Sequence, residues 1–231
     1  MDNSQLRSSV GNLPIQKDGE ITVERFVSFL DIMGFKDLVA RNEHHVILSK
    51  LTKLTDFISE KVGSQEGFHF SMFSDSIMIY SDDSSFQSFE TLVEFTSAIV
   101  HKSISIGLPI KGAIAKGICT ATTGAKLLYF GQPIIDAFKL EENLVIYGVA
   151  IHNTAEEEAI KLFEKDGNIH IYDYKVKLKS AASNHFILNW YGKDIKKSIY
   201  MLNLIRMSVS DAPRRYIDNT LESIYFLKEM M

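Results

Sequence analysis

The chain has 231 residues, of which 45% are hydrophobic and 23% charged, and its formal net charge is −4. This slightly acidic balance excludes an overall attraction to nucleic acid or to an acidic membrane surface, so we expect neither as a partner. The one cysteine, Cys119, excludes an intrachain disulfide and a cysteine-rich metal site. The start has no signal-peptide core and no uncharged run has the length of a membrane span, so we expect a cytoplasmic protein.

The N-terminal part of the sequence predicts an arm, a strand and a helix. Residues 1–20 are polar and contain Gly, Pro and Ser, which predicts a flexible N-terminal arm ahead of a single domain at 21–231. The run "RFVSFLDIMGF" is dense in apolar and β-prone residues and predicts a buried strand. Between residues 35 and 62, apolar side chains recur at steps of three and four, which predicts one long helix.

The middle of the chain continues with a hairpin, a helix and a strand. The runs "GFHFSMF" and "SIMIYS" predict two strands with Ser74 and Asp75 at their turn. Helical spacing follows "SS" at 84–85, and "LPIKGAIAKGICTAT" predicts another strand. Beyond it we expect a helix at 133–142, strands near 145–151, 168–175 and 185–190, a helix at 153–165 and a helical tail.

The order of these elements predicts an α+β fold with a ferredoxin-like βαββαβ core, followed by extra C-terminal strands and helices. In such a core the first and third strands lie side by side at the centre of the sheet. Asp31 lies near the end of the first strand, and Asp75 lies at the hairpin that starts the third. We therefore expect these two carboxylates to converge at one end of the sheet.

Two converging carboxylates predict a metal site. Without compensation they would repel each other and at least one pKa would rise, whereas Mg²⁺ or Mn²⁺ binds carboxylate oxygens together with substrate phosphates. Gly34 and Phe35 begin a helix directly after Asp31, and the free N–H groups of its first turn attract phosphate. Taken singly, Asp31 and Asp75 are better explained as a cap and a turn residue; the pair, in this order, favours the metal.

Four motifs in this order resemble those of class III nucleotide cyclase homology domains. "FLDIMGF" is similar to the strand–loop motif F-x-D-I-x-G-F, and "FSDSIMIYS" to the Gly-Asp hairpin, with Ser74 where glycine is usual. "IKGAIAKG" is similar to R-x-G-I-H-x-G, and "YFGQPIIDAFKLEE" to F-G-x-x-V-N-x-A-x-R-L-E. The motifs span about residues 26–142.

The resemblance implies an enzyme and its site. Asp31 and Asp75 match the family's metal-binding aspartates, and the Ile32 carbonyl matches the backbone ligand. Two Mn²⁺ or Mg²⁺ ions per active site would activate the ribose 3′-hydroxyl of a nucleoside triphosphate for attack on the α-phosphorus. In the family the sites lie between two antiparallel chains, so the resemblance implies a homodimer.

Other positions depart from the family pattern. The asparagine and arginine that stabilise the family's transition state are replaced by Ile135 and Lys139, so the resemblance assigns the catalytic cation to Lys139. The family's phosphate-binding arginine is replaced by Ile118, and Lys116 on the same strand face is the candidate substitute. Lys177 and Lys179 could reach the triphosphate across the dimer, as a lysine of the family does, although strand alternation equally predicts a solvent-facing ladder.

The positions that select the base are Ser71 and Leu128, where adenylate cyclases have lysine and aspartate. The Glu/Cys pair of guanylate cyclases is also absent. The C-terminal segments resemble a bacterial branch that includes the pyrimidine cyclases of Pycsar anti-phage signalling, which make cyclic CMP or cyclic UMP with manganese. The resemblance therefore implies a pyrimidine triphosphate, of which we favour UTP, and a separate effector that binds the cyclic nucleotide. The alternatives are a cytidylate cyclase, a purine cyclase with relocated base contacts, and a degenerate module that binds nucleotide without turnover.

One histidine has two interpretations. His152 precedes "NTAEEEA", which is typical of a helix start with Asn153 or Thr154 as the cap. We therefore expect a structural role for His152, with a catalytic or metal-binding histidine as the alternative. The neighbouring His44 and His45 are expected on the exposed side of the first helix.

Overall fold

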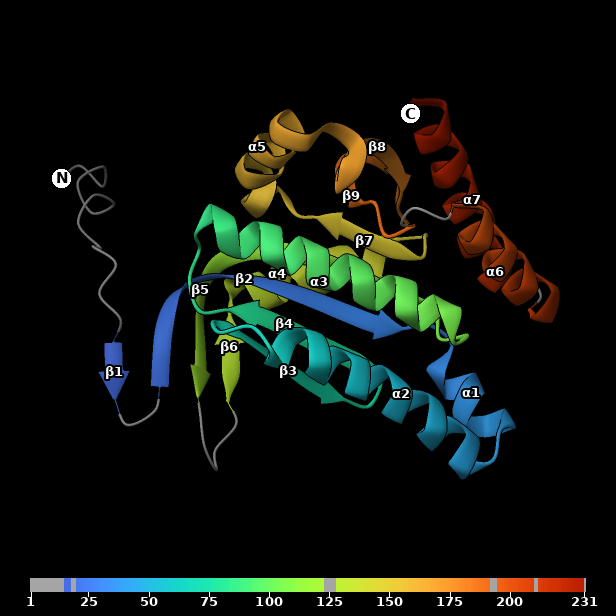
Figure 1. Cartoon of the computed structure of the whole chain (residues 1–231), viewed down its shortest axis with the longest axis horizontal. Coiled ribbons are helices and arrows are strands. Elements are labelled where there is room, and N and C mark those ends of the chain that lie inside the picture. The colour runs from blue at the N-terminus through green and yellow to red at the C-terminus, as the bar shows by residue number, and fades with distance from the viewer. Residues whose placement is uncertain (1–14, 18–19, 123–127, 192–194, 210–211, 231) are drawn as a thin grey trace.

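The computed structural model describes residues 15–17, 20–122, 128–191, 195–209 and 212–230 (Figure 1). Its strands are β1 (Ile15–Lys17), β2 (Glu20–Ile32), β3 (Phe68–Phe73), β4 (Ser76–Ser81), β5 (Ile110–Thr122), β6 (Tyr129–Gly131), β7 (Gly148–Ile151), β8 (Ile171–Lys177) and β9 (Ala182–Leu188). Its helices are α1 (Phe35–Arg41), α2 (His44–Gly63), α3 (Phe86–Ser105), α4 (Gln132–Asn143), α5 (Glu156–Asp166), α6 (Ile195–Ser208) and α7 (Ala212–Met230), with short 3₁₀ turns η1 (Asn153–Ala155) and η2 (Gly167–Ile169).

The strands form one sheet in the order β3-β4-β2-β5-β7-β9-β8, with β1 paired to β2 and β6 paired to β5. Strand β2 is antiparallel to both β4 and β5, so the first and third strands of the core are neighbours at its centre. This confirms the predicted α+β fold and its ferredoxin-like βαββαβ core. Strands β7, β8 and β9 and helices α6 and α7 are the predicted C-terminal additions.

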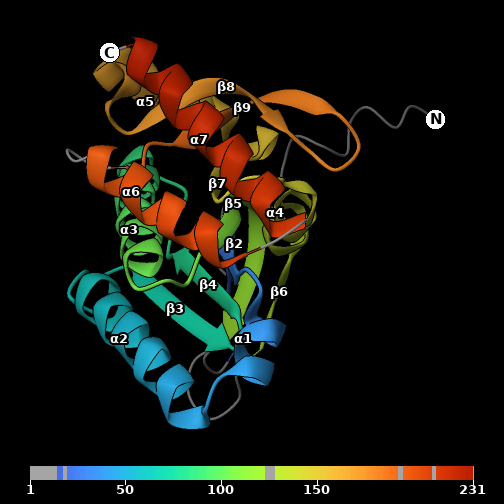
Figure 2. The same cartoon turned by 90° about the vertical axis from the view of Figure 1, so that its right-hand side faces the viewer.

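Helices cover the two faces of the sheet unequally. Figure 2 shows α2 and α3 on one side and α4 on the other. Alternate β2 residues point to opposite faces: the Phe26 ring lies 5.3 Å from Phe89 of α3, whereas the Phe29 ring lies 5.6 Å from Phe138 of α4. Asp31 shares the α4 face with Phe29, because the two residues are two positions apart.

The centre of the sheet depends on a close approach between β2 and β5. A Cβ atom placed on Gly112 would lie 2.4 Å from a Leu30 methyl carbon and 2.5 Å from the Phe29 carbonyl oxygen. Neither distance is compatible with a side chain, so only glycine fits this position of β5. The glycine of the "IKGAIAKG" motif therefore has a packing role that is independent of any chemistry.

The structure differs from two sequence predictions at the N-terminal side. The predicted long helix is divided into α1 and α2, because Asn42 adopts an extended backbone and its side-chain amide donates to the Leu38 carbonyl over 2.8 Å. The predicted arm contributes β1, and β2 begins at Glu20, earlier than expected. Residues 1–14 of the arm lie outside the described residues.

The C-terminal half joins the core through its own buried polar network. The Tyr172 hydroxyl lies 2.9 Å from the Tyr191 hydroxyl, which lies 3.0 Å from the Ser223 hydroxyl of α7. These contacts attach α7 to β8 and make the additional strands part of one core. Among the described helices, none combines the length and apolar character that crossing a membrane requires.

Candidate active site

Asp31 and Asp75 lie at the same end of two paired strands. Asp31 is opposite Ser76 in the β2–β4 register, and the Ile32 N–H donates to the Asp75 carbonyl over 3.0 Å. Ser74, just before Asp75, has a φ of 58°, a left-handed conformation that glycine adopts more readily. The register thus brings together the two carboxylates that the sequence predicts to converge.

The charge at this end of the sheet is unbalanced. The pKa of Asp31 is raised from 3.8 to about 6, first by burial and then by the carboxylates of Glu141 and Asp75, against the opposing effect of Lys111. Within the described residues, neither aspartate has a cationic side chain within 4.0 Å. The arrangement therefore carries negative charge that a cation would neutralise.

The donors present suit a hard divalent cation. Both aspartates offer carboxylate oxygens, and the Ile32 carbonyl faces the turn that carries Asp75, because the N–H and C=O groups of one residue point to the same neighbouring strand in an antiparallel pair. The described residues contain no cluster of three or more His, Cys, Asp or Glu side chains suited to a metal. A cation here would thus complete its shell with water or phosphate oxygens, as Mg²⁺ commonly does.

A buried ion pair that sequence reasoning missed lies beside Asp31. Lys111 is opposite Asp31 in the β2–β5 register, and its Nζ lies 2.9 Å from Glu141 Oε1 and donates to the Glu141 carbonyl over 2.8 Å. Both side chains are almost fully buried. The pair connects the strand beside Asp31 to α4. A lysine inside an apolar strand was the available sequence signal, because a buried charge requires a partner.

Two further predicted substrate positions lie near the aspartates. Gly34, with a φ of 72°, precedes the first residue of α1, Phe35, so the α1 start follows the end of β2 directly. Ser71 is opposite Met78, which pairs with the β2 residue two positions before Asp31. Ser71 therefore shares a sheet face with Asp31, because side chains of paired strand residues point to the same face.

Lys179 also lies at this end of the sheet. Its backbone N–H donates to the Asn143 carbonyl at the end of α4 over 2.8 Å. Burial raises the pKa of Glu141, and the charges of Lys111 and Lys179 both oppose this rise. The Lys179 ammonium is therefore close enough to Glu141 to oppose the rise in its pKa. The Glu141 carboxylate in turn raises the pKa of Asp31.

Two other predicted residues are not brought to the aspartates of the same chain. The Lys116 Nζ donates to Glu158 over 2.8 Å and lies 5.7 Å from the Phe26 ring centre, on the α3 face of the sheet. Leu128 forms two hydrogen bonds with Thr122 at the opposite end of β5, its N–H donating to the hydroxyl and its carbonyl accepting from the N–H. Lys116 is therefore paired with Glu158, and Leu128 lies far from Asp31.

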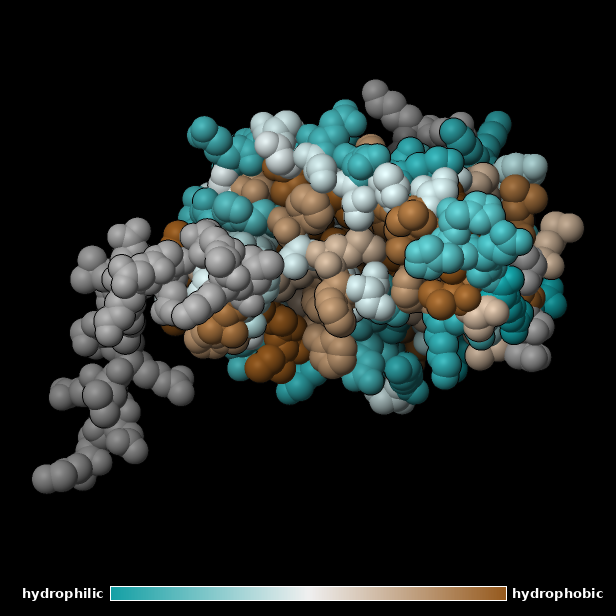
Figure 3. All heavy atoms as spheres, turned by 90° about the horizontal axis from the view of Figure 1, so that it is seen from below, coloured by the Kyte–Doolittle hydropathy of each residue, from teal (hydrophilic) through white to brown (hydrophobic). Residues whose placement is uncertain are grey.

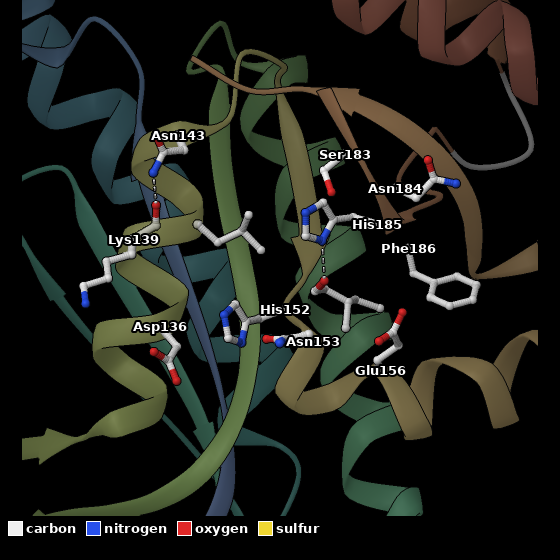
Figure 4. A pocket seen from close by; sticks show the side chains of 12 residues that line it. Asp136, Lys139, Asn143, His152, Asn153, Glu156, Ser183, Asn184, His185 and Phe186 are labelled. Atoms are coloured by element: carbon white, nitrogen blue, oxygen red, sulfur yellow. Dashed lines mark hydrogen bonds between the residues drawn. The ribbon is translucent and has the colours of Figure 1, made fainter. Parts of the chain in front are cut away.

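Lys139 lies on the side of α4 that borders a pocket of about 500 Å³ (Figure 4). The polar side chains that line it include Asp136 and Lys139 of α4, His152 and Asn153 after β7, and Asn184 and His185 of β9. His152 is itself the cap of η1, accepting from the Thr154 N–H, where Asn153 or Thr154 was expected. This confirms a structural role for His152 but also places its ring in a pocket that the sequence did not predict.

Hydrophobic side chains are exposed around these elements. The exposed fractions are 85% for Phe73, 56% for Phe130, 47% for Ile135 and 46% for Phe138. Seen from below, the molecule shows hydrophobic residues gathered in the middle of one face, between hydrophilic ones (Figure 3). Exposed hydrophobic groups of this kind are typical of an interaction surface.

Solved structures of nucleotide cyclases share this fold. The adenylyl cyclase CyaB from P. aeruginosa is 18% identical, with a TM-score of 0.56 over 73% of this chain and 95% of that chain. A bacterial light-regulated adenylyl cyclase is 14% identical, with a TM-score of 0.57 over 86% of this chain and 60% of that chain. The guanylate cyclase domain of RhGC from Catenaria anguillulae, in complex with GTP, is 16% identical, with a TM-score of 0.52 over 74% and 98%.

These likenesses establish the fold at identities too low to establish more. No family model and no curated protein matches the sequence. The α+β core with its C-terminal additions is therefore the class III cyclase fold, as the motifs predict. The roles of individual residues depend on the geometry described above.

Proposed function

We propose that the protein is a metal-dependent nucleotide cyclase that converts UTP into 3′,5′-cyclic UMP and pyrophosphate. The observation that carries the proposal is the meeting of Asp31 and Asp75 at adjacent strand ends, with no cationic side chain of the described residues within 4.0 Å of either. The fold shared with adenylyl and guanylyl cyclase structures supports it.

The reaction joins two atoms of one substrate. The ribose 3′-oxygen attacks the α-phosphorus, the bond from that phosphorus to the bridging oxygen breaks, pyrophosphate leaves, and the hydroxyl proton passes to solvent. Asp31, Asp75 and the Ile32 carbonyl would hold two Mn²⁺ or Mg²⁺ ions, which when bound supply activation of the hydroxyl and neutralisation of the phosphates. The backbone N–H groups that follow Gly34, from Phe35 onward, face the phosphate end.

The remaining groups require a second copy of the chain. Lys139 of α4 has no acid within 4.0 Å among the described residues, and Leu128 lies at the far end of β5 from Asp31. A two-fold homodimer would present Lys139 of one chain to Asp31 and Asp75 of the other, where its charge would stabilise the transition state. The exposed Phe138, one residue before Lys139 on α4, supports an interface there.

The choice of base follows from what is lacking. Ser71 and Leu128 match neither the Lys/Asp pair nor the Glu/Cys pair with which the family selects purines, which supports a pyrimidine. The sequence resemblance covers both UTP and CTP, between which we choose UTP, and it alone implies a product bound by a separate effector in anti-phage defence. The replacement of family residues by Ile118 and Ile135 favours one second candidate, a module that binds nucleotide without turnover.

Product analysis tests the proposal. Purified protein is incubated with ATP, GTP, CTP or UTP and Mn²⁺, and the products are resolved by mass. We expect cyclic UMP as the main product, with none when the metal is chelated. Cyclic CMP or a cyclic purine would contradict the base assignment, and binding without any cyclic product would establish the second candidate.

A further inference from the structure

The pocket between α4 and β9 contains a histidine whose free ring nitrogen is an acceptor. His185 Nδ1 lies 3.2 Å from the Ile151 carbonyl oxygen. A carbonyl only accepts hydrogen bonds, so Nδ1 carries the hydrogen and donates it. In the neutral ring, Nε2 of His185 is then left with a lone pair. Figure 4 shows this ring projecting from β9 into the space between β9 and α4.

The second histidine of the pocket has the opposite tautomer. His152 Nδ1 accepts from the Thr154 N–H over 3.3 Å and lies 3.0 Å from the Thr154 hydroxyl oxygen. Burial lowers the pKa of His152, against the opposing charge of Asp136, so the ring is neutral near pH 7. Its hydrogen is therefore on Nε2, and this nitrogen is a donor. Together the two rings offer one donor and one acceptor.

The rest of the lining favours a neutral ligand. The carboxylates of Asp136 and Glu156 border the same space, so a phosphate group inside it would be repelled. Ser183, two positions before His185 on β9, adds a hydroxyl on the same side of the strand, whereas Figure 4 shows the side chains of Asn184 and Phe186 on the other side. The volume of about 500 Å³ is in the range of pockets that hold small ligands.

The cation of the pocket lies at its edge. The ammonium of Lys139 extends away from the two histidines in Figure 4, and no acid within 4.0 Å pairs with it among the described residues. A ligand that reaches both the histidines and Lys139 is therefore long, with a neutral, hydrogen-bonding group at one end and an anionic group at the other. A nucleotide has this distribution of charge.

We infer that this pocket, and not the pair Ser71 and Leu128, binds the base of the substrate nucleotide, with His152 and His185 hydrogen-bonding its edge. Adjacent acceptor and donor groups, as in O4 and N3–H of uracil, complement the two ring nitrogens. Ser71 offers a single hydroxyl and Leu128 an apolar side chain, so neither can supply such a pair. The inference rests on the proposed function, because it names the specificity-determining residues of that same site.

Binding of UMP without metal tests the inference separately from turnover. The probe is the set of imidazole ¹⁵N resonances in long-range ¹H–¹⁵N spectra of the full chain, titrated with UMP and, in parallel, CMP. We expect UMP to shift the Nε2 resonances of His152 and His185 and to leave those of His45, exposed on α2, unchanged. No shift of either pocket histidine at millimolar UMP would overturn the inference.

Two variants preserve the structural bonds and remove only the ligand contacts. In His185→Asn the side-chain N–H can still donate to the Ile151 carbonyl, and in His152→Asn the side-chain oxygen can still cap η1, because asparagine is a preferred cap. Each variant should weaken UMP binding about tenfold, the effect of one hydrogen bond, with an unchanged melting temperature. His45→Asn is the matched control and should bind UMP as the wild type does.

The outcomes separate the pocket from the reaction. If UMP shifts both histidines but no triphosphate gives a cyclic product, the pocket is a nucleotide site and the cyclase proposal is wrong. If cyclic UMP forms while both asparagine variants retain the wild-type affinity and Ser71→Val loses it, the base lies at β3 and the inference is overturned.

Discussion

The end of the sheet with Asp31 and Asp75 and the pocket between α4 and β9 differ in how the chain builds them. The two aspartates depend on one strand register, β2 against β4, and each lies within a short contiguous motif. The pocket takes its side chains from α4, the segment after β7, α5 and β9. A site whose residues are brought together by one strand register can be predicted from the sequence. A pocket lined by several elements cannot, because its shape depends on how those elements pack against one another.

The largest expected effect is at the aspartates. Asp75→Asn keeps the size and shape of the side chain but removes the charge that would hold the metal, so turnover should fall by about 10³-fold or more. The half-buried turn position implies little change in melting temperature. Asp56→Asn, on the exposed side of α2, is the control and should be fully active. If Asp75→Asn kept its activity, Asp75 would not hold a catalytic metal. The end of the sheet with Asp31 and Asp75 would then have no chemical role that the pocket lacks.

The buried ion pair between the two regions is the next test. Lys111→Ala leaves Glu141 buried without its partner and should lower the free energy of unfolding by about 3–5 kcal/mol, measured by urea denaturation. The double change Lys111→Met with Glu141→Leu removes both charges and should recover most of this loss. A Lys111→Ala protein as stable as the wild type would show that the pair does not hold α4 against β5.

The prediction of this fold succeeded where local patterns and tertiary packing agree. The spacing of apolar residues after the serines at 84–85 predicted α3, and Ser85 caps this helix by accepting from the Ser88 N–H over 3.2 Å. The same periodicity merged α1 with α2, because apolar spacing continues through the break that Asn42 makes with its own backbone conformation and side-chain bond. Local polar contacts of this kind do not appear in a hydrophobic pattern.

The candidate site was predictable to a different degree. The meeting of Asp31 and Asp75 follows from strand order, so the sequence could predict it. The partner of Lys111 could not be predicted, because it depends on the distance between α4 and β5. The tautomer of His185 likewise depends on the Ile151 carbonyl, which belongs to another strand.

A smaller effect is expected on the pH dependence of the free energy of unfolding, to which Asp31 contributes unfavourably. Its folded-state pKa of about 6 exceeds the ordinary 3.8, so the folded state binds the proton more tightly, and this group destabilises the protein as pH rises from about 4 to about 6. Asp31→Asn should therefore raise the free energy of unfolding at pH 7.5 by an amount on the order of 1 kcal/mol, after discounting for partial exposure, and give no gain at pH 3.5.

The same change should remove the response to metal. Mn²⁺ should raise the melting temperature of the wild type at pH 7.5, because binding to the folded state alone stabilises it, and should leave Asp31→Asn unchanged. Thermal melts with and without Mn²⁺ measure both effects. Equal Mn²⁺ stabilisation of the variant would place the metal elsewhere.

The smallest expected effect is at the turn before Asp75. Ser74 adopts a φ of 58°, so Ser74→Gly should relieve strain and raise the free energy of unfolding by up to about 1 kcal/mol without loss of activity. Ser74→Val should have the opposite sign, because a β-branched residue tolerates this conformation poorly. If Ser74→Gly lowered the free energy of unfolding, the contacts of the serine side chain would stabilise the fold by more than its left-handed backbone destabilises it.

Mixing two inactive variants tests the central claim most directly, namely that the aspartates of one chain act with Lys139 of another. Asp75→Ala and Lys139→Ala proteins, carrying different tags, are co-expressed, and mixed dimers are isolated and assayed for cyclic UMP. Each mixed dimer would contain one intact site of two, so we predict about half the wild-type activity, where either variant alone has none. Mixed dimers as inactive as their parents would contradict a site shared between chains.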